Sequence, residues 1–224
     1  MKSEVAGIKR YDPLQLYPTN VFHSVLDIPE LLEKWKYECN KLIPNQKTIK
    51  SYRGSRPWCS DDDLYNLPQF KELVDFIILE TNYGLDCMKI ERDSHYISSL
   101  WLNAQYQDNN HSLHTHANSL FSGVVYIDTP KNSQSLIFQD PRPQTQILVP
   151  SVIKNPDGTL SDEDPAHMPC VIPKPGCLYF WPSWLPHATY SDTYEELERP
   201  RLTVAFNIMI KGKNNSHSAR YTFV

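Results

Sequence analysis

Three histidines and a later arginine form the pattern in this sequence best suited to chemistry. His114 and His116 are two positions apart, so in an extended strand their side chains point to the same face. His187 comes from a distant part of the chain and would add a third imidazole. Three imidazoles on one side of a metal ion leave other coordination positions open, and divalent iron accepts imidazole ligands. The pattern therefore predicts a catalytic metal centre and not a structural one.

The surroundings of His187 support this interpretation. It follows Trp181-Pro182-Ser183-Trp184-Leu185-Pro186, where prolines restrict the backbone and tryptophans would form a dry wall beside a metal. The alternative for His187 is a turn histidine packed on tryptophans. For His114 and His116, the alternatives are two half-buried polar residues or a zinc pair, because single short motifs have a high false-positive rate.

Arg201 and Thr203 are also two positions apart, at the start of the last apolar segment. A guanidinium group binds a carboxylate through two parallel hydrogen bonds, and a threonine two residues on would add a hydroxyl donor. We therefore expect a clamp for a dicarboxylic acid beside the metal. The alternative is an ion pair at the strand end with Glu195, Glu196 or Glu198.

Hydrophobic periodicity predicts the elements that hold these residues. One helix is expected over residues 28–43, with Asp27 as its N-cap and Pro29 in its first turn. A second helix is expected after Asn66 and should stop at Gly84. These would form a helical layer before the β-rich part of the chain.

From residue 93 onward, short alternating segments separated by turn residues predict strands. In the first, Leu102 and Tyr106 share one face, whereas Asn103 and Gln105 share the other. The strand candidates are residues 96–106, 111–116, 120–128, 135–139, 170–172, 177–181, 187–190 and 201–210. Many short strands indicate a sandwich or barrel. The polar, proline-rich stretch from Pro141 to Pro169 is predicted to be a lid or substrate-facing loop.

Composition excludes several classes of protein. The 224 residues suit a single all-β domain, and the formal net charge of −4 gives no basic field for binding nucleic acid. No apolar run is long enough to span a membrane, and the first residues lack the apolar core of a signal peptide. The 5 cysteines are odd in number, which favours reduced thiols. We expect a soluble, cytoplasmic protein, and the sequence leaves a homodimer open.

Longer motifs resemble the family of putative 2-oxoglutarate/Fe(II)-dependent oxygenases. They are Trp101-Leu102-Asn103, His114-Thr115-His116 and residues 120–126 (LFSGVVY), 138–142 (FQDPR), 180–187 (FWPSWLPH) and 201–207 (RLTVAFN). The resemblance implies a mainly β fold with flanking helices: a double-stranded β-helix, or jelly roll, with the N-terminal helices packed on one sheet. It divides one domain into a helical layer (residues 1–92), a jelly-roll core (93–210) and a tail (211–224).

The resemblance also implies the ligands and the reaction. His114, His116 and His187 would bind one Fe(II). Arg201 with Thr203 would hold the distal carboxylate of 2-oxoglutarate, and Asn103 or Tyr106 would assist. The implied reaction consumes O2, converts 2-oxoglutarate to succinate and CO2, and hydroxylates a substrate that the sequence does not identify.

His116 departs from the superfamily pattern, in which most members carry Asp or Glu at that position. Either three histidines bind iron, or another group completes the site, with Asp108 and Asp140 as candidates by proximity in the sequence. A third alternative is an open position that takes chloride, as in related halogenases. Two other classes stay open: a cupin-like metal dioxygenase or isomerase without 2-oxoglutarate, against which the Arg201 motif speaks, and a non-catalytic jelly-roll binding or structural protein.

Overall fold

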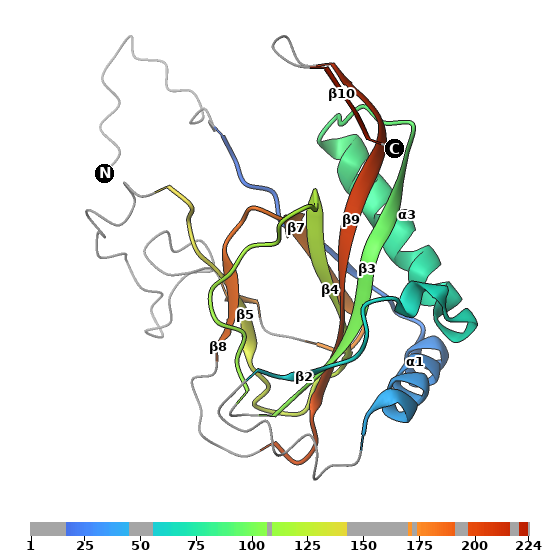
Figure 1. The fold of residues 1–224 in the computed structure, drawn as a ribbon. Coiled ribbons are helices and arrows are strands. Elements are labelled where there is room, and N and C mark those ends of the chain that lie inside the picture. The colour runs from blue at the N-terminus through green and yellow to red at the C-terminus, as the bar shows by residue number, and fades with distance from the viewer. Residues whose placement is uncertain are drawn as a thin grey trace, which may run out of the picture.

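Two antiparallel sheets face each other in the computed structural model, and helices cover the outer side of the larger sheet (Figure 1). The structure describes residues 17–44, 56–106, 109–142, 170–171, 174–190, 197–215 and 220–223. The predicted loop from Pro141 to Pro169 lies outside the described residues from position 143 onward. Among the described residues, no helix is long and apolar enough to cross a membrane.

The two sheets form the predicted jelly roll. The larger has seven strands in the order β1-β7-β4-β9-β3-β2, with β10 paired to β9. Its strands are β1 (Phe22–Val25), β2 (Trp58–Cys59), β3 (Ser94–Gln105), β4 (Phe121–Asp128), β7 (Cys177–Pro182), β9 (Arg201–Asn215) and β10 (Arg220–Phe223). The smaller sheet has the order β6-β5-β8 and consists of β5 (Ser135–Phe138), β6 (Cys170–Val171) and β8 (His187–Tyr190).

The helices before β3 pack against the larger sheet. They are α1 (Pro29–Leu42), the 3-10 turns η1 (Leu64–Asn66) and η2 (Pro68–Phe70), and α3 (Lys71–Cys87). Trp35 and Cys39, one turn apart on α1, are completely buried, as expected for an amphipathic helix. The predicted Asp27 cap is wrong: the N-cap is Ile28 and no side chain caps the helix. Pro29 begins the helix without an N–H, so one donor fewer needs a cap.

Gly84 does not end its helix, contrary to the prediction. The helix α3 continues to Cys87, and Gly84 is buried inside it. A Cβ atom at this position would overlap the aromatic ring of Phe180 on β7. The glycine is therefore explained by the close approach of a strand side chain to the helix, and not by a turn.

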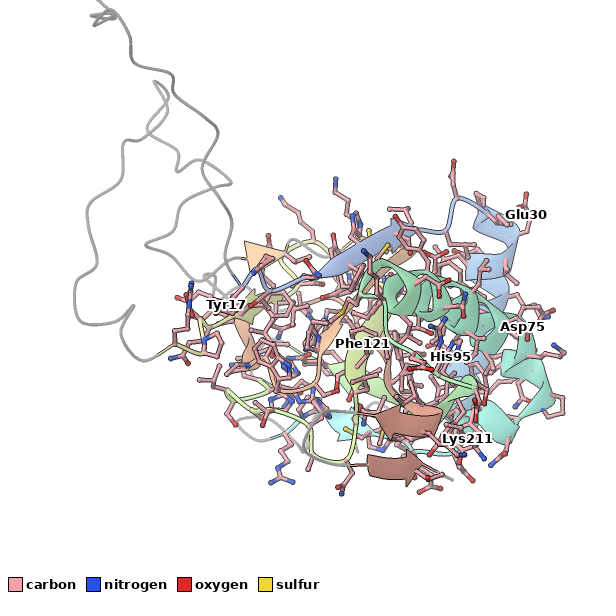
Figure 2. All side chains as sticks on the ribbon, turned by 90° about the horizontal axis from the view of Figure 1, so that it is seen from above. Tyr17, Glu30, Asp75, His95, Phe121 and Lys211 are labelled. Atoms are coloured by element: carbon pink, nitrogen blue, oxygen red, sulfur yellow. The ribbon has the colours of Figure 1, made fainter. Side chains whose placement is uncertain are left out.

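The main hydrophobic core lies between the helices and the larger sheet. Its centre contains an aromatic group in which the rings of Phe22 and Phe180 stack at 4.7 Å and Phe121 packs against both with its edge. Figure 2 shows Phe121 inside the molecule, whereas Glu30 and Asp75 point outward from their helices. Full burial of each such ring stabilises the fold by about 1.5–3 kcal/mol.

Several strand boundaries differ from the prediction. Residues 111–116 form no regular strand, and only His114 makes an isolated bridge. The strand β9 extends beyond the predicted end at Ile210 into the tail, where it pairs with β10. The strands β1, β2 and β10 were not predicted. They have 4, 2 and 4 residues, which is too short to establish an alternating pattern.

Replacing Gly84 by alanine tests the packing of α3 on β7. We expect the variant to be about 1–3 kcal/mol less stable in urea-induced unfolding, because an added methyl group overpacks the core. This would occur although alanine favours helix by about 1 kcal/mol. In a Phe180→Leu background, the same change should become neutral or stabilising. A more stable Gly84→Ala protein in the parent background would contradict the packing described.

Candidate metal centre

A pocket opens between the two sheets and contains almost every side chain predicted to do chemistry. Its lining includes all three predicted ligands, both residues of the predicted clamp and several aromatic rings. These residues are Trp101, Asn103, His111, His114, His116, Tyr126, Trp181, His187, Arg201 and Thr203.

The floor of the pocket consists of side chains on β3, β4 and β9, which the register of the larger sheet places side by side. Thr203 on β9 lies opposite Asn103 on β3 and opposite Tyr126 on β4. Arg201 lies opposite Gln105, two pairs further along the same two strands. Side chains at paired and alternate positions share one face of a sheet. The period-2 pattern that predicted these faces therefore also accounts for the floor of the pocket.

The three predicted histidines converge. Each offers one ring nitrogen to a group whose ligand atoms all lie within 4.8 Å of one another. The Nε2 atoms of His116 and His187 are 3.3 Å apart. Two nitrogens that share one ion at about 2.1 Å each have this kind of separation. Among the described residues, no carboxylate joins this group.

Backbone hydrogen bonds to β8 and its preceding turn bring His114 and His116 to His187. His114 and His187 exchange two bonds of 3.0 Å, and the N–H of His116 donates to the carbonyl of Ser183 at 3.0 Å. The predicted strand over 111–116 is wrong, but the predicted convergence of the imidazoles is observed. The side chains of His114 and His116 meet His187 because their segment is hydrogen-bonded to β8 and the turn before it. The alternation of side chains in a regular strand is not the reason.

Hydrogen bonds at Nδ1 orient two of the imidazoles. Nδ1 of His114 lies 2.7 Å from the carbonyl of Ser112, and Nδ1 of His187 lies 3.0 Å from the carbonyl of Leu185. A carbonyl only accepts, so the tautomer with the proton on Nδ1 satisfies both contacts and leaves Nε2 for a metal. The indole N–H of Trp181 is 3.2 Å from the same Nδ1 of His187. An indole only donates, so it would bond only to the other tautomer.

The site favours the neutral form of two of the imidazoles. Burial lowers the pKa of His187 to about 3, and burial with the nearby His114 lowers the pKa of His116 to about 4. The ring of Trp181 packs edge-on against His187 at 4.7 Å and excludes water from one side, as predicted. Trp184, which was expected to share this role, is 55% exposed. Neutral imidazole is the form that binds metals.

Arg201 is a buried cation held by neutral groups. It is 3% exposed, and its Nη1 and Nη2 atoms donate to the carbonyl of Gln134 and to Oε1 of Gln105, each at 2.5 Å. Its Nε is buried without a hydrogen-bond partner. Among the described residues no carboxylate pairs with it, and Glu198 instead lies near Arg199. Arg201 therefore has unused donors and an uncompensated charge beside the histidines, which fits a carboxylate ligand.

Asn103 and Tyr106, the two residues predicted to assist the clamp, lie in different surroundings. Oδ1 of Asn103 accepts from Trp101 at 3.2 Å and from Cys59 at 3.1 Å, so the amide orientation is fixed in the pocket lining. Tyr106 packs in the hydrophobic core and is not part of that lining, so the prediction that it assists is not supported. The alternation along β3 had already placed Tyr106 on the opposite face from Asn103.

Three features of the site were missed or misjudged from the sequence. Gln105, which holds the guanidinium group, was given no role. A regular strand over residues 111–116 would place His111 and His114 on opposite faces, yet His111 lines the same pocket, with its ring centroid 6.0 Å from that of His114. Asp140, a candidate third ligand, instead pairs with Arg142 at 2.6 Å. Asp108, the other candidate, lies outside the described residues.

A comparison with protein families matches the β-rich part of the chain. Residues 99–207 match the model of a family described as "Putative 2OG-Fe(II) oxygenase", where 2OG is 2-oxoglutarate. The match covers just under half of the chain and confirms, for these residues, the resemblance noted in the sequence motifs. Comparison with curated proteins gave no significant match.

Solved structures share the fold at low sequence identity. A prolyl-4-hydroxylase of Pseudomonas putida has a TM-score of 0.53 and 15% identity, with 87% of this chain and 94% of that chain covered. The non-heme alpha-ketoglutarate-dependent epimerase SnoN from nogalamycin biosynthesis has a TM-score of 0.55 and 15% identity, with 88% and 79% covered. HygX from Streptomyces hygroscopicus, with nickel and 2-oxoglutarate bound, has a TM-score of 0.54 and 14% identity, with 85% and 82% covered.

Single alanine substitutions test whether all three imidazoles bind the metal. Replacing His114, His116 or His187 should weaken anaerobic Fe(II) binding by about 10-fold or more, since even outer groups around a metal contribute this much. The exposed His23 provides a matched control, and His23→Ala should bind as the parent does. Full-strength binding by the His116→Ala protein would leave a two-histidine site.

Proposed function

We propose that the protein hydroxylates a substrate, still unidentified, while it decarboxylates 2-oxoglutarate. In the balanced reaction, one atom of O2 enters a substrate C–H bond and the other enters the succinate formed from 2-oxoglutarate, with release of CO2. Bound Fe(II) would supply the activation of O2. The chain itself would bind and orient both organic reactants and exclude water.

One observation carries this proposal: a buried, uncompensated guanidinium group lies in the same pocket as three converging imidazoles. A metal alone does not need such a cation beside it. A dicarboxylic acid with a 2-oxo group uses both parts, because one carboxylate binds Arg201 while the 2-oxo acid end reaches the metal. Thr203 and Asn103 lie between them on the pocket floor and would contact the acid along its length.

The three-histidine site would give the metal one more positive charge than a site with a carboxylate. His114, His116 and His187 would hold the ion through Nε2, with Ser112 and Leu185 fixing two of the rings. A cupin-like dioxygenase or isomerase without 2-oxoglutarate would share these ligands. Such an enzyme has no use for a buried arginine held by neutral partners, so we favour the 2-oxoglutarate reaction.

The substrate, the partners and the compartment are part of the proposal. A net charge of −4 favours a substrate other than nucleic acid, and a homodimer stays open. The described cysteines, Cys39, Cys59, Cys87 and Cys177, are free thiols, which is consistent with a reducing compartment such as the cytoplasm. The loop predicted at 141–169 would contribute to substrate choice.

Two substitutions test the clamp from both sides of one hydrogen bond. Arg201→Lys keeps the charge but loses the planar fork, so 2-oxoglutarate should bind about 10- to 100-fold more weakly, or about 1.5–3 kcal/mol. Gln105→Glu is nearly isosteric but pairs the guanidinium group with a carboxylate, so it should also weaken 2-oxoglutarate binding. Calorimetry on the Fe(II)-loaded, oxygen-free protein measures both.

Fe(II) binding should survive in both variants, because neither residue belongs to the histidine group. The control is Gln134→Ala, since Arg201 donates to the backbone carbonyl of Gln134, which the substitution keeps, whereas the Gln134 side chain donates to the carbonyl of Tyr106. Unchanged 2-oxoglutarate affinity in Arg201→Lys and in Arg201→Ala would refute the clamp and favour the cupin alternative.

Succinate formation tests the reaction itself. The parent protein with Fe(II), ascorbate and O2 should convert 2-oxoglutarate slowly to succinate, and a pool containing the substrate should increase the rate. Arg201→Ala and His187→Ala should each lower succinate release by at least 10-fold, because one removes the clamp and the other a ligand. Metal binding and 2-oxoglutarate binding without any succinate would contradict the proposed oxygenase chemistry.

A further inference from the structure

His111 occupies the pocket without a role in the metal group. It lines the pocket together with Arg201 and His114, yet it is not among the three histidines whose ligand atoms converge. Its ring nitrogens form no hydrogen bond with another described residue. The His111 side chain is half-buried, and polar groups shielded from water normally find a hydrogen-bond partner. The ring of His111 therefore has an N–H available to a molecule in the pocket.

The backbone of His111 is fixed by the network that holds Arg201. The N–H of His111 donates to Oγ1 of Thr189 at 2.9 Å, and the N–H of Thr189 donates to the carbonyl of His111 at 3.0 Å. The same Thr189 hydroxyl accepts from Nε2 of Gln105 at 3.0 Å. Oε1 of Gln105 accepts from Arg201. Arg201, Gln105, Thr189 and His111 thus form one connected polar unit.

This network also explains why His111 does not point away from His114. In a regular strand, positions separated by three residues lie on opposite faces. Here the Thr189 side chain takes the place of a backbone carbonyl as the partner of the His111 N–H, so the regular ladder is interrupted. The irregular backbone therefore allows His111 and His114 to line the same pocket.

We propose that His111 is a second binding residue for the acid carboxylate that Arg201 holds, and that it donates its ring N–H to that carboxylate. This inference rests on the proposed function. Arg201 supplies the charge, whereas His111 supplies a neutral donor fixed through Thr189 to the same network. Together they would select an acid with a second carboxylate over a 2-oxo acid that has only one.

The test compares two acids and two kinds of variant. His111→Phe keeps a ring but has no donor, whereas His111→Gln keeps an N–H donor. With the Fe(II)-loaded, oxygen-free protein, 2-oxoglutarate should bind about 10-fold more weakly to His111→Phe, and His111→Gln should recover most of the loss. The monocarboxylate 2-oxobutyrate should bind equally to all three proteins. Fluorescence of Trp101 and Trp181, which line the pocket, reports binding without turnover.

Fe(II) affinity and thermal melting of each variant complete the experiment. Both should match the parent, and His111→Ala serves as a second donor-free variant if His111→Phe folds poorly. The proposal is overturned if donor-free variants bind 2-oxoglutarate as the parent does, if they lose 2-oxobutyrate to the same extent, or if they lose Fe(II). If the parent itself fails to bind 2-oxoglutarate, the proposed function fails; if only Arg201→Ala binds weakly, that function stands and the role of His111 does not.

Discussion

The buried charge of Arg201 is the constraint on which the rest of the site depends. A guanidinium group stays protonated in proteins, and removing an unpaired charge from water is costly. Here Gln105 and the carbonyl of Gln134 satisfy two of its donors, but neither neutralises it. Burial lowers the pKa of Arg201 from its ordinary value, which reflects the same unfavourable surroundings. An anion that enters the pocket would relieve this cost, so part of the affinity for a carboxylate is built into the folded protein.

The three imidazoles present a related problem. His114 and His187 direct their unprotonated nitrogens into one space, and His116 lies 3.3 Å from His187. Without a proton between them, two such lone pairs repel each other, and a cation relieves that repulsion. Hydrogen bonds among three serines hold the backbone behind the site. The carbonyl of Ser183 accepts from the N–H of His116, and the hydroxyl of Ser183 forms hydrogen bonds with Ser119 and Ser122 at 2.8 and 2.9 Å. A bound metal ion would relieve the repulsion among the imidazoles, and a bound carboxylate would compensate the charge of the nearby Arg201.

Sequence patterns predicted those parts of the structure that repeat locally. Alternation along β3 and β9 predicted which residues face the pocket, and helical periodicity predicted the helix over residues 28–43 whose Trp35 and Cys39 are buried. Pairings between distant segments were not accessible in this way. The role of Gln105 depends on its register with Arg201, and Gly84 is explained only by Phe180 on a distant strand. The strand predicted over residues 111–116 would have put His111 on the wrong face, because this segment is irregular and irregular backbone has no sequence period.

The most direct measurement is an oxygen-free crystal structure of the protein with Fe(II) and 2-oxoglutarate. We predict that Nε2 of His114, His116 and His187 all bind one ion, that no carboxylate of the chain joins them, and that one carboxylate of 2-oxoglutarate lies against Arg201. The central claim is that this pocket binds an acid between a metal held by three histidines and the buried cation of Arg201. A metal held by a side-chain carboxylate, or a 2-oxoglutarate molecule bound away from Arg201, would contradict it.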